Sequence, residues 1–199
     1  MFPDLFRDDV FRIETRRLWL RWPTARDAGA ITRLAGDRAV AEMTARIPHP
    51  LERRVVDAFL LEVRGANLAG TGLTLAIADR AAPGRLIGLV GIALAEGGEA
   101  PHLGYWLGRE RWGTGLMSEA AAALVHAYFA WAGGTRLIAE ARVDNPASRR
   151  VLERAGFVAE GRTVRSVPLR GGDHAVDCFR LDRAGWLAAA APVPAARAA

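Results

Sequence analysis

The sequence predicts one α/β domain, an α+β mixed sheet of six to seven mostly antiparallel strands with one parallel pair and about four helices. Three apolar runs separated by short turns lie between residues 73 and 107 and indicate an antiparallel meander. A helical pattern at 118–131 then separates the last of these runs from an apolar run at 136–143. A helix between two strands lets them pair in parallel as a right-handed crossover. Because parallel pairing is slightly weaker, the sheet is expected to splay at this central pair.

Local signals define the expected elements of the first half of the chain. Pro23 ends the first strand, because proline cannot donate to a sheet ladder. Thr24 stands three residues before Asp27, which is the spacing of a capping box at a helix start. Two prolines exclude regular structure from residues 47–50, and this loop is a candidate wall for a binding site. The expected elements are a strand at 18–22, a helix at 24–34, a short turn at 38–43, a helix at 51–67, and strands at 73–77 and 86–94.

Turn and capping residues define the second half in the same way. Glycines at 133–134 stop one helix, and Asn145 followed by Pro146 is typical of the start of another. Glycines at 171–172 turn the chain in a closing hairpin. The expected elements are a turn at 96–99, a strand at 103–107, a helix at 118–131, a strand at 136–143, a helix at 145–156, and hairpin strands at 157–169 and 175–181.

The chain divides into three parts by composition and pattern. Residues 1–12 are an N-terminal extension, 13–187 form the domain, and 188–199 are rich in alanine and proline without periodicity and are expected to be a disordered tail. No apolar run approaches the length of a membrane span, and residues 1–12 lack the features of a secretion signal. A cytoplasmic protein without a membrane partner is therefore expected.

Cysteine usage and charge exclude several kinds of site. Cys178 is the single cysteine and the four histidines are scattered, so neither an internal disulfide nor a metal site is expected. The net charge of +5 comes from arginine alone, and without lysine no Schiff base can form on the protein. This charge suits an anionic ligand, and it equally fits arginine on solvated surfaces. No basic run with interleaved aromatic residues occurs, which disfavours nucleic acid as a partner, while a homodimer is left open.

Residues 102–117 form the stretch most typical of a ligand site. A strand leads into a loop with Gly113 and Gly115, and a helix follows. Such a loop lets a ligand approach the backbone, and the free N–H groups and positive end of the helix suit a diphosphate. A nucleoside-triphosphatase loop is excluded because it needs a lysine, and a dinucleotide fingerprint fits poorly because Ser118 occupies its third glycine. A coenzyme A pyrophosphate cradle and a simple tight turn remain.

Several motifs resemble the RimJ/RimL-like branch of the GNAT N-acetyltransferases, over nearly the whole chain from about residue 13 to 181. The motifs are Thr-Arg-Arg-Leu-Trp-Leu-Arg at 15–21, Gly-Tyr-Trp-Leu at 104–107, Trp-Gly-Thr-Gly at 112–115 with Ser-Glu-Ala at 118–120, Asp-Asn-Pro-Ala-Ser at 144–148 and Val-Leu-Glu-Arg-Ala-Gly-Phe at 151–157. The resemblance implies the GNAT fold, acetyl-CoA as cofactor, CoA as product and no metal. It also implies direct acetyl transfer to a primary amine of a protein N-terminus or a small molecule.

The resemblance implies a cofactor site along the glycine loop. The amides of residues 111–116 would hold the pyrophosphate, and Arg109 or Arg111 would neutralise phosphate charge. Glu110 departs from the family motif, which normally carries glutamine or arginine there. The N–H of Leu107, or else that of the residue before it, would polarise the acetyl carbonyl. The expected cofactor-binding residues are Trp106, Leu107, Arg109, Arg111, Trp112, Gly113, Thr114, Gly115, Leu116, Asn145 and Ser148.

The resemblance also implies catalytic residues, which are His102, Ser148 and Leu107. Ser148 would hydrogen-bond the thiolate and Asn145 the pantetheine amides, although both residues fit a helix start equally well. His102 stands where relatives often carry a glutamate, and its ordinary pKa suits proton removal near neutrality. An ordinary surface histidine is the alternative. Ribosomal-protein members carry a further glutamate where Val167 stands here, so either His102 acts through a water or no single base dominates. The remaining histidines, expected to be structural or exposed, are His49, His126 and His174.

Two other functions stay open at this stage. The chain could be a non-catalytic CoA-binding sensor or interaction module, which thioester consumption with an amine panel would exclude. It could also be an arginine-rich nucleic-acid binder, which would bind any duplex with a steep salt dependence. The walls expected to select the acceptor are residues 46–51 and 164–174, and their shapes cannot be read from the sequence.

Overall fold

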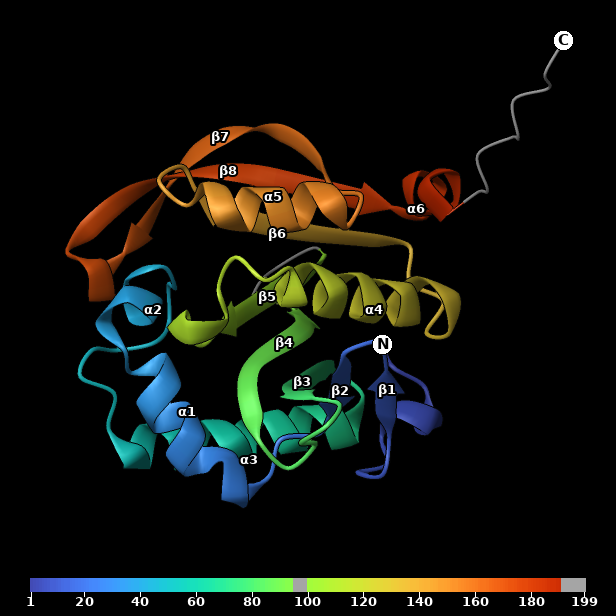
Figure 1. Ribbon diagram of the computed structural model, residues 1–199. Coiled ribbons are helices and arrows are strands. Elements are labelled where there is room, and N and C mark those ends of the chain that lie inside the picture. The colour runs from blue at the N-terminus through green and yellow to red at the C-terminus, as the bar shows by residue number, and fades with distance from the viewer. Residues whose placement is uncertain (95–99, 191–199) are drawn as a thin grey trace, which may run out of the picture.

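A computed structural model describes residues 1–94 and 100–190 (Figure 1). Within these residues the chain forms one eight-stranded mixed sheet in the order β1-β2-β3-β4-β5-β6-β8-β7. The strands are β1 (Arg12–Glu14), β2 (Leu18–Arg21), β3 (Gly72–Asp79), β4 (Leu86–Leu94), β5 (Pro101–Leu107), β6 (Arg136–Arg142), β7 (Val158–Val167) and β8 (Gly172–Asp182). The helices are α1 (Ala28–Ala35), α2 (Arg38–Glu42), α3 (Arg53–Ala69), α4 (Leu116–Ala130), α5 (Pro146–Arg154) and α6 (Arg183–Ala190). The predicted fold class is confirmed, with slightly more strands and helices than expected.

The parallel pair lies at the centre of the sheet and is very short. Strands β1 to β5 pair antiparallel, and so do β6, β8 and β7. Between these two halves, β5 and β6 pair in parallel at a single position, where His102 stands opposite Ile138. Beyond this position β5 continues to Leu107 without pairing to β6, so the predicted splay is present and opens a gap in the sheet.

Helices cover both faces of the sheet and fix which side chains face which layer. In Figure 1, α1 and α3 lie together on one side of β3 and β4, while α4 and α5 lie side by side on the other. Alternation along the strands separates two hydrophobic clusters, because successive side chains point to opposite faces. Leu75 and Ile77 pack in the cluster that includes α4, whereas Ala76 between them packs with α1 and α3.

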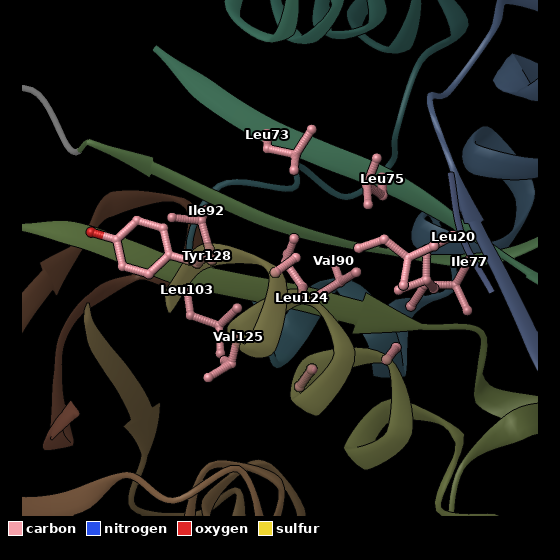
Figure 2. Packing of buried hydrophobic residues seen from close by; sticks show 14 of the residues in the cluster. Leu20, Leu73, Leu75, Ile77, Val90, Ile92, Leu103, Leu124, Val125 and Tyr128 are labelled. Carbon is pink, nitrogen blue, oxygen red and sulfur yellow. The ribbon is translucent and has the colours of Figure 1, made fainter. Parts of the chain in front are cut away.

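The main core lies between the sheet and α4. Figure 2 shows Leu124, Val125 and Tyr128 of α4 directed toward apolar side chains of the strands, among them Val90 and Ile92. These side chains are almost completely removed from solvent. Truncating such a buried aliphatic side chain to alanine typically costs about 2–5 kcal/mol of stability. The core therefore holds α4, and with it the loop that precedes α4, firmly against the sheet.

Three elements were not predicted as strands or helices, and each has a physical reason. Helix α2 falls on the expected turn at 38–43; its five residues are too few to show a helical period, and the Asp37 side chain caps it by accepting the N–H of Ala39 at 2.8 Å. Strand β1 has three residues, too few for alternation to be visible in the sequence, and it is ordered by pairing with β2. Helix α6 has no apolar periodicity, but its Trp186 stacks on Phe129 of α4 with ring centroids 5.5 Å apart. The tail predicted from residue 188 therefore begins inside α6. The rest of that prediction, 191–199, and the predicted turn at 96–99 lie outside the described residues.

The predicted N-terminal extension packs into the domain. Phe2 and Phe6 are fully buried in the main core, and Phe2 lies edge-on to Tyr128 of α4 with centroids 6.0 Å apart. Phe11 is buried beside them, with its ring centroid 4.6 Å from that of Phe6. Residues 1–12 thus contribute to the core. Across residues 1–94 and 100–190, no helix combines the length and apolar character needed to cross a membrane.

Candidate active site

The loop after β5 is bent by two glycines. A single 3-10 turn at Arg109–Arg111 follows the strand, and Gly113 and Gly115 then adopt positive φ angles of 73° and 75°. Residues other than glycine rarely adopt this left-handed backbone conformation, so glycine is favoured at both positions. Gly115 is the N-cap of α4, and it has no side chain with which to satisfy the first amides of the helix.

A run of main-chain amides therefore stays available at the start of α4. The N–H of Arg111 donates to Gly108 at 2.9 Å and that of Trp112 to Arg109 at 3.1 Å. Within the part of the chain that the structure describes, the N–H groups of residues 113–118 donate to no protein acceptor. The amides expected to be available were those of residues 111–116; the 3-10 turn uses the amides of 111 and 112, so the free run lies two positions further along the chain.

Side chains on both sides hold the loop in place. The indole Nε1 of Trp112 donates to the carbonyl of Leu107 at 2.7 Å, which folds the loop back on the end of β5. Arg17 donates from Nη1 to the carbonyl of Thr114 at 2.9 Å and from Nε to Glu119 at 2.6 Å. Glu119 also accepts the hydroxyl of Thr15 at 2.6 Å. Arginine, threonine and glutamate thus fasten the loop to the start of β2.

Glu119 is held as a carboxylate by these contacts. Burial alone would raise the pKa of Glu119, but hydrogen bonds from Thr15 and Arg17 outweigh burial and lower the pKa. The motifs at 15–21 and 118–120 were noted in the sequence for their family resemblance, yet they suggested no role for these side chains. The structure shows that the two motifs contact each other and support the loop.

The arginines expected to neutralise phosphate differ in their surroundings. Arg111 is partly buried and pairs with Asp79 at the end of β3, with Nη2 and Oδ2 2.8 Å apart. Arg109 is exposed on the 3-10 turn. Of the other residues expected around the cofactor, Leu116 is buried in the core so that its amide alone is available, and Trp106 packs against the cluster formed with α1 and α3.

The end of β5 turns backbone donors toward the gap between β5 and β6. Leu107 stands opposite Gly88 of β4, and the next residue, Gly108, donates its N–H to the carbonyl of Ile87 at 2.9 Å. Opposed residues in an antiparallel ladder alternate between bonded and non-bonded pairs, so the N–H of Leu107 points away from β4 and toward the gap. By the same alternation the N–H of Trp106 points toward β4. The geometry favours Leu107 over Trp106 as a donor to a ligand in the gap.

Ser148 lies on the far side of the gap and contacts a tyrosine that the sequence analysis did not single out. The side-chain oxygen of Asn145 accepts the N–H of Ser148 at 3.0 Å, so Asn145 is the N-cap of α5. The Tyr105 hydroxyl lies 3.0 Å from Ser148 Oγ and donates to the Ser148 carbonyl at 3.1 Å. Burial raises the pKa of Tyr105 to about 12, with the hydrogen bond to Ser148 opposing it, so the phenol stays protonated at neutral pH.

Tyr105 could have been found from the strand pattern. Leu103 and Leu107 are buried toward α4, and Tyr105 lies between them on the same face at a spacing of two. A helix that follows the next strand must cover this face of the crossover, which places its first turn near Tyr105. The alternation that assigns the apolar residues of β5 to a face therefore also assigns the polar Tyr105 to it.

The opposite face carries His102 and a carboxylate. His102 alternates with Leu103 and so faces away from α4, as does Glu140 of β6, which alternates with buried Ala139 and Ala141. Gly104 lies next to His102 on this face, and no atom lies within 4 Å of where its Cβ would stand. The face is therefore open beside the gap.

The charges on this face set the protonation state of His102. Burial lowers the pKa of His102, Arg46 and Arg165 lower it further, and Glu140 opposes them. The net effect keeps the imidazole neutral near pH 7. Glu140 is itself held by Arg165, whose Nε and Nη2 donate to Oε1 at 2.8 Å and 2.6 Å. Val167, where the resemblance pointed to a missing glutamate, is buried at the end of β7, whereas the carboxylate that acts on His102 is that of Glu140.

The two walls expected around an acceptor contact each other. Arg170, in the turn between β7 and β8, donates to the carbonyl of Thr44 at 3.0 Å and to those of Ala41 and Ile47. Arg142 adds a contact from β6 to the carbonyl of Glu42 at 2.9 Å. The segment after α2 and the closing hairpin thus form one continuous rim on the face that carries His102. Across residues 1–94 and 100–190, no cluster of histidine, cysteine and carboxylate side chains is suited to holding a metal ion.

Known proteins resemble this chain in sequence and in fold. Residues 17–158 match a family model described as acetyltransferase (GNAT) domain. A ribosomal-protein-serine acetyltransferase of Escherichia coli strain K12 is 42% identical over 60 residues, 30% of this chain and 34% of that protein, so the match spans about a third of the relative.

Solved structures extend the likeness to most of the chain. The ribosomal-protein-S5-alanine acetyltransferase of Vibrio fischeri has a TM-score of 0.76 at 20% identity, covering 88% of this chain and 98% of that one. The RimL ribosomal L7/L12 α-N-protein acetyltransferase, solved with coenzyme A, has a TM-score of 0.75 at 22% identity, covering 86% and 98%. The chain therefore belongs to the GNAT acetyltransferase family.

Proposed function

We propose that the protein transfers the acetyl group of acetyl-CoA to the α-amine of a protein N-terminus in the cytoplasm and releases CoA. The observation that carries this proposal is the run of free amides at residues 113–118, placed beside the gap between β5 and β6. Such amides at a helix start bind phosphate oxygens well. A small-molecule primary amine is the alternative acceptor. The names of the relatives, which act on ribosomal proteins, support the protein N-terminus.

The residues at the loop fit the diphosphate of this cofactor. Gly113 has open space where a side chain would stand, so a ligand can lie directly against the backbone. The partly buried guanidinium of Arg111 lies in the same loop and adds positive charge. Bound acetyl-CoA would supply an acetyl group activated as a thioester, and the protein would supply the orientation and the hydrogen bonds around it.

Two neutral donors would serve the acyl end. The N–H of Leu107 points into the gap and would donate to the thioester carbonyl as negative charge develops there, a contribution of about 3 kcal/mol in comparable oxyanion sites. Ser148 would donate to the sulfur as the carbon–sulfur bond breaks, and Tyr105 would then donate its hydroxyl hydrogen to Ser148 Oγ in place of the Ser148 carbonyl. Because a serine hydroxyl is a weak acid, it stabilises the thiolate, and solvent supplies the final proton.

The amine would enter from the face that carries His102. This face is open at Gly104 and bounded by the rim around Arg170, while α4 and α5 cover the other face. Neutral His102, directly or through a water, would take the proton that the nitrogen loses as the carbon–nitrogen bond forms. The negative charge of Glu140 would stabilise the resulting imidazolium.

The test is thiol release with a panel of amines in the presence of acetyl-CoA, together with calorimetric titration of acetyl-CoA alone. Peptides with a free N-terminal serine or alanine should release thiol, and the same peptides acetylated at the N-terminus should not. Spermidine would represent small amines. Failure to bind acetyl-CoA would refute the proposal.

A second candidate function is a CoA-binding sensor without catalysis, which Val167 favours because the family resemblance implies a glutamate at this position and the valine here is buried. A protein that binds acetyl-CoA but releases no thiol with any amine of the panel would support the sensor and contradict the transferase.

A further inference from the structure

A basic cavity lies beside the glycine loop, on the side away from the gap. Its volume is about 580 Å³, and it lies between the ends of β2 and β3 and the start of α4. Four arginines line it, and we name it the arginine pocket after them: Arg16, Arg17, Arg80 and Arg111. Thr114 and Leu116, whose amides are free, line it as well, so the pocket and the amide run are continuous.

The arginine pocket keeps a surplus of positive charge. Arg111 is paired with Asp79 at 2.8 Å and Arg17 with Glu119 at 2.6 Å. Arg80 has a looser contact with Glu14 at 3.6 Å, and among the described residues Arg16 forms no ion pair. A guanidinium has five N–H donors, so even the paired arginines keep donors for a further anion. Phosphate oxygens are the acceptors that arginine forks recognise best.

The loop itself brings one guanidinium close to the amides. Arg17 Nη2 lies 3.6 Å from the point where a Cβ on Gly115 would stand, and Arg17 Nη1 donates to the carbonyl of Thr114 at 2.9 Å. The missing side chain at Gly115 therefore leaves room for arginine at the edge of the amide run. A ligand bound to those amides would be within reach of the pocket.

The position of the pocket in the sheet indicates which part of a ligand it would meet. The order of strands is β2-β3-β4-β5-β6, so the gap between β5 and β6 and the pocket at β2 and β3 lie on opposite sides of the loop. In coenzyme A the diphosphate joins the pantetheine arm to a nucleoside that carries a 3′-phosphate. With pantetheine in the gap and the diphosphate at the loop, a nucleoside on the side of the loop away from the gap would lie within reach of the arginine pocket.

We propose that the arginine pocket binds the 3′-phosphate of the carrier nucleotide and makes the protein selective for CoA thioesters over dephospho-CoA thioesters. This inference rests on the proposed function, because it takes the diphosphate to lie on the loop. Arg16 and Arg80 are the specificity-determining residues, since their side chains are exposed and least engaged by carboxylates. Arg17 and Arg111 also hold the loop through Glu119, Thr114 and Asp79, so replacing them would alter the loop as well as the pocket.

The experiment is calorimetric titration of the full chain with acetyl-CoA and with acetyl-dephospho-CoA. The wild-type protein should bind acetyl-CoA at least about tenfold more tightly, the size expected for a charge-assisted phosphate contact. The double variant Arg16→Ala, Arg80→Ala should bind both thioesters with the affinity that the wild type shows for the dephospho form.

A matched control removes two exposed arginines elsewhere. Arg53 and Arg54 lie at the start of α3 in ion pairs with Asp57 and Glu52. The variant Arg53→Ala, Arg54→Ala changes the net charge equally and should keep the wild-type preference. Thermal melting of each variant verifies that it is folded.

The outcomes separate this inference from the proposed function. Equal affinity of the wild type for the two thioesters would overturn the pocket assignment and leave the transferase proposal standing, and so would an unchanged preference in the Arg16 and Arg80 variant. A free phosphate bound from solution would give no preference between the thioesters and counts as the same refutation. If neither thioester binds, the proposed function itself fails.

Discussion

The two faces of the sheet beside the gap between β5 and β6 are built from different groups. On the face covered by α4 and α5, the polar groups are main-chain amides at 113–118 and the neutral pair Tyr105 and Ser148. On the opposite face they are titratable side chains from three strands, His102 on β5, Glu140 on β6 and Arg165 on β7. The first face depends on backbone conformation, and the second on charges brought together by the topology.

This difference predicts how each face responds to change. A site made of amides tolerates many side chains but depends on glycine wherever φ is positive. A site made of titratable groups responds to pH and to the removal of a single charge. Binding of the acetyl donor should therefore be sensitive to the glycines and nearly independent of pH near neutrality, whereas turnover should follow the state of His102.

The largest effect is expected for Gly113→Val. Valine is strained at the φ of 73°, and its branched side chain would fill the open space in which a ligand is proposed to lie against the backbone. The affinity for acetyl-CoA should fall about 100-fold or more, equivalent to about 2.7 kcal/mol. Isothermal titration calorimetry measures the loss, and undiminished affinity would rule out the loop as the diphosphate site.

Gly133→Val is the matched control for this substitution. Gly133 has a φ of 68° and, like Gly113, open space around the Cβ position, but it lies after the other end of α4. Both variants carry the same backbone strain of about 1–2 kcal/mol. Only the change at Gly113 should weaken acetyl-CoA binding, and a similar loss in both variants would show that strain alone is responsible.

The next effect is expected for His102→Ala. Removing a general base should lower kcat/KM about 100-fold at neutral pH and leave the Kd for acetyl-CoA unchanged. Steady-state kinetics with the best peptide acceptor and calorimetry provide the two numbers. Unchanged turnover would remove His102 from the mechanism.

The pH profile tests the charges around His102. Burial lowers the pKa of His102, so kcat/KM should be lost as the pH falls through a value below the ordinary 6.5 of histidine. Glu140 opposes this shift, and Glu140→Gln should therefore move the acidic limb to still lower pH. The exposed Glu153, replaced by glutamine, is the control and should leave the limb where it is. If the acidic limb stays at the same pH in Glu140→Gln, Glu140 does not influence the pKa of His102.

A smaller effect is expected for Tyr105→Phe. Loss of the phenol hydroxyl frees the Ser148 side chain, so kcat should fall about tenfold with little change in the KM for acetyl-CoA. The variant Ser148→Ala should lose at least as much, and the double variant no more than Ser148→Ala alone, because Tyr105 acts through Ser148.

Tyr128→Phe is the control for Tyr105→Phe. The hydroxyl of Tyr128 also donates to a main-chain carbonyl, that of Arg136 at 3.1 Å, at a distance from the gap. Each substitution should cost about 1 kcal/mol of stability. An equal fall in kcat for both variants would show that the effect at Tyr105 is only structural.

The smallest effect is expected for Arg170→Ala. The carbonyls of Thr44 and Ile47 lose the Arg170 donor, as does that of Ala41 at the end of α2, which still accepts from Thr44, and the rim around the acceptor face loosens. The KM for the peptide acceptor should rise roughly threefold, while the Kd for acetyl-CoA stays constant. A change in the affinity for acetyl-CoA instead would contradict the assignment of Arg170 to the acceptor face.

The backbone site could be predicted from the sequence because its signals are local. Gly113, Gly115 and the helical pattern after them are adjacent, and the structure gives them the expected strand, loop and helix. The exact amides could not be read off, because the 3-10 turn at Arg109–Arg111 has no sequence signature strong enough to show that it uses two of them.

The charged face could not be predicted because its residues meet only through the topology. Glu140 and Arg165 are 25 positions apart and lie on strands separated by β8. Alternation along a strand can place Glu140 on a face of the sheet, but it carries no sign that β7 brings Arg165 across to it. The rim at Arg170 shows the same limit, since it joins segments 126 residues apart in sequence.

The two halves of the sheet pair with each other at one position, His102 opposite Ile138, and this affects the stability of the domain. Acetyl-CoA bound in the gap between β5 and β6 would contact the loop after β5 and helix α5 after β6. It would therefore connect the two halves of the sheet at a second place. At 100 times its Kd such a ligand adds about 2.7 kcal/mol of protection against unfolding. Amide hydrogen exchange along β6 should therefore slow markedly when acetyl-CoA binds, and more than along the continuous ladder of β3 and β4.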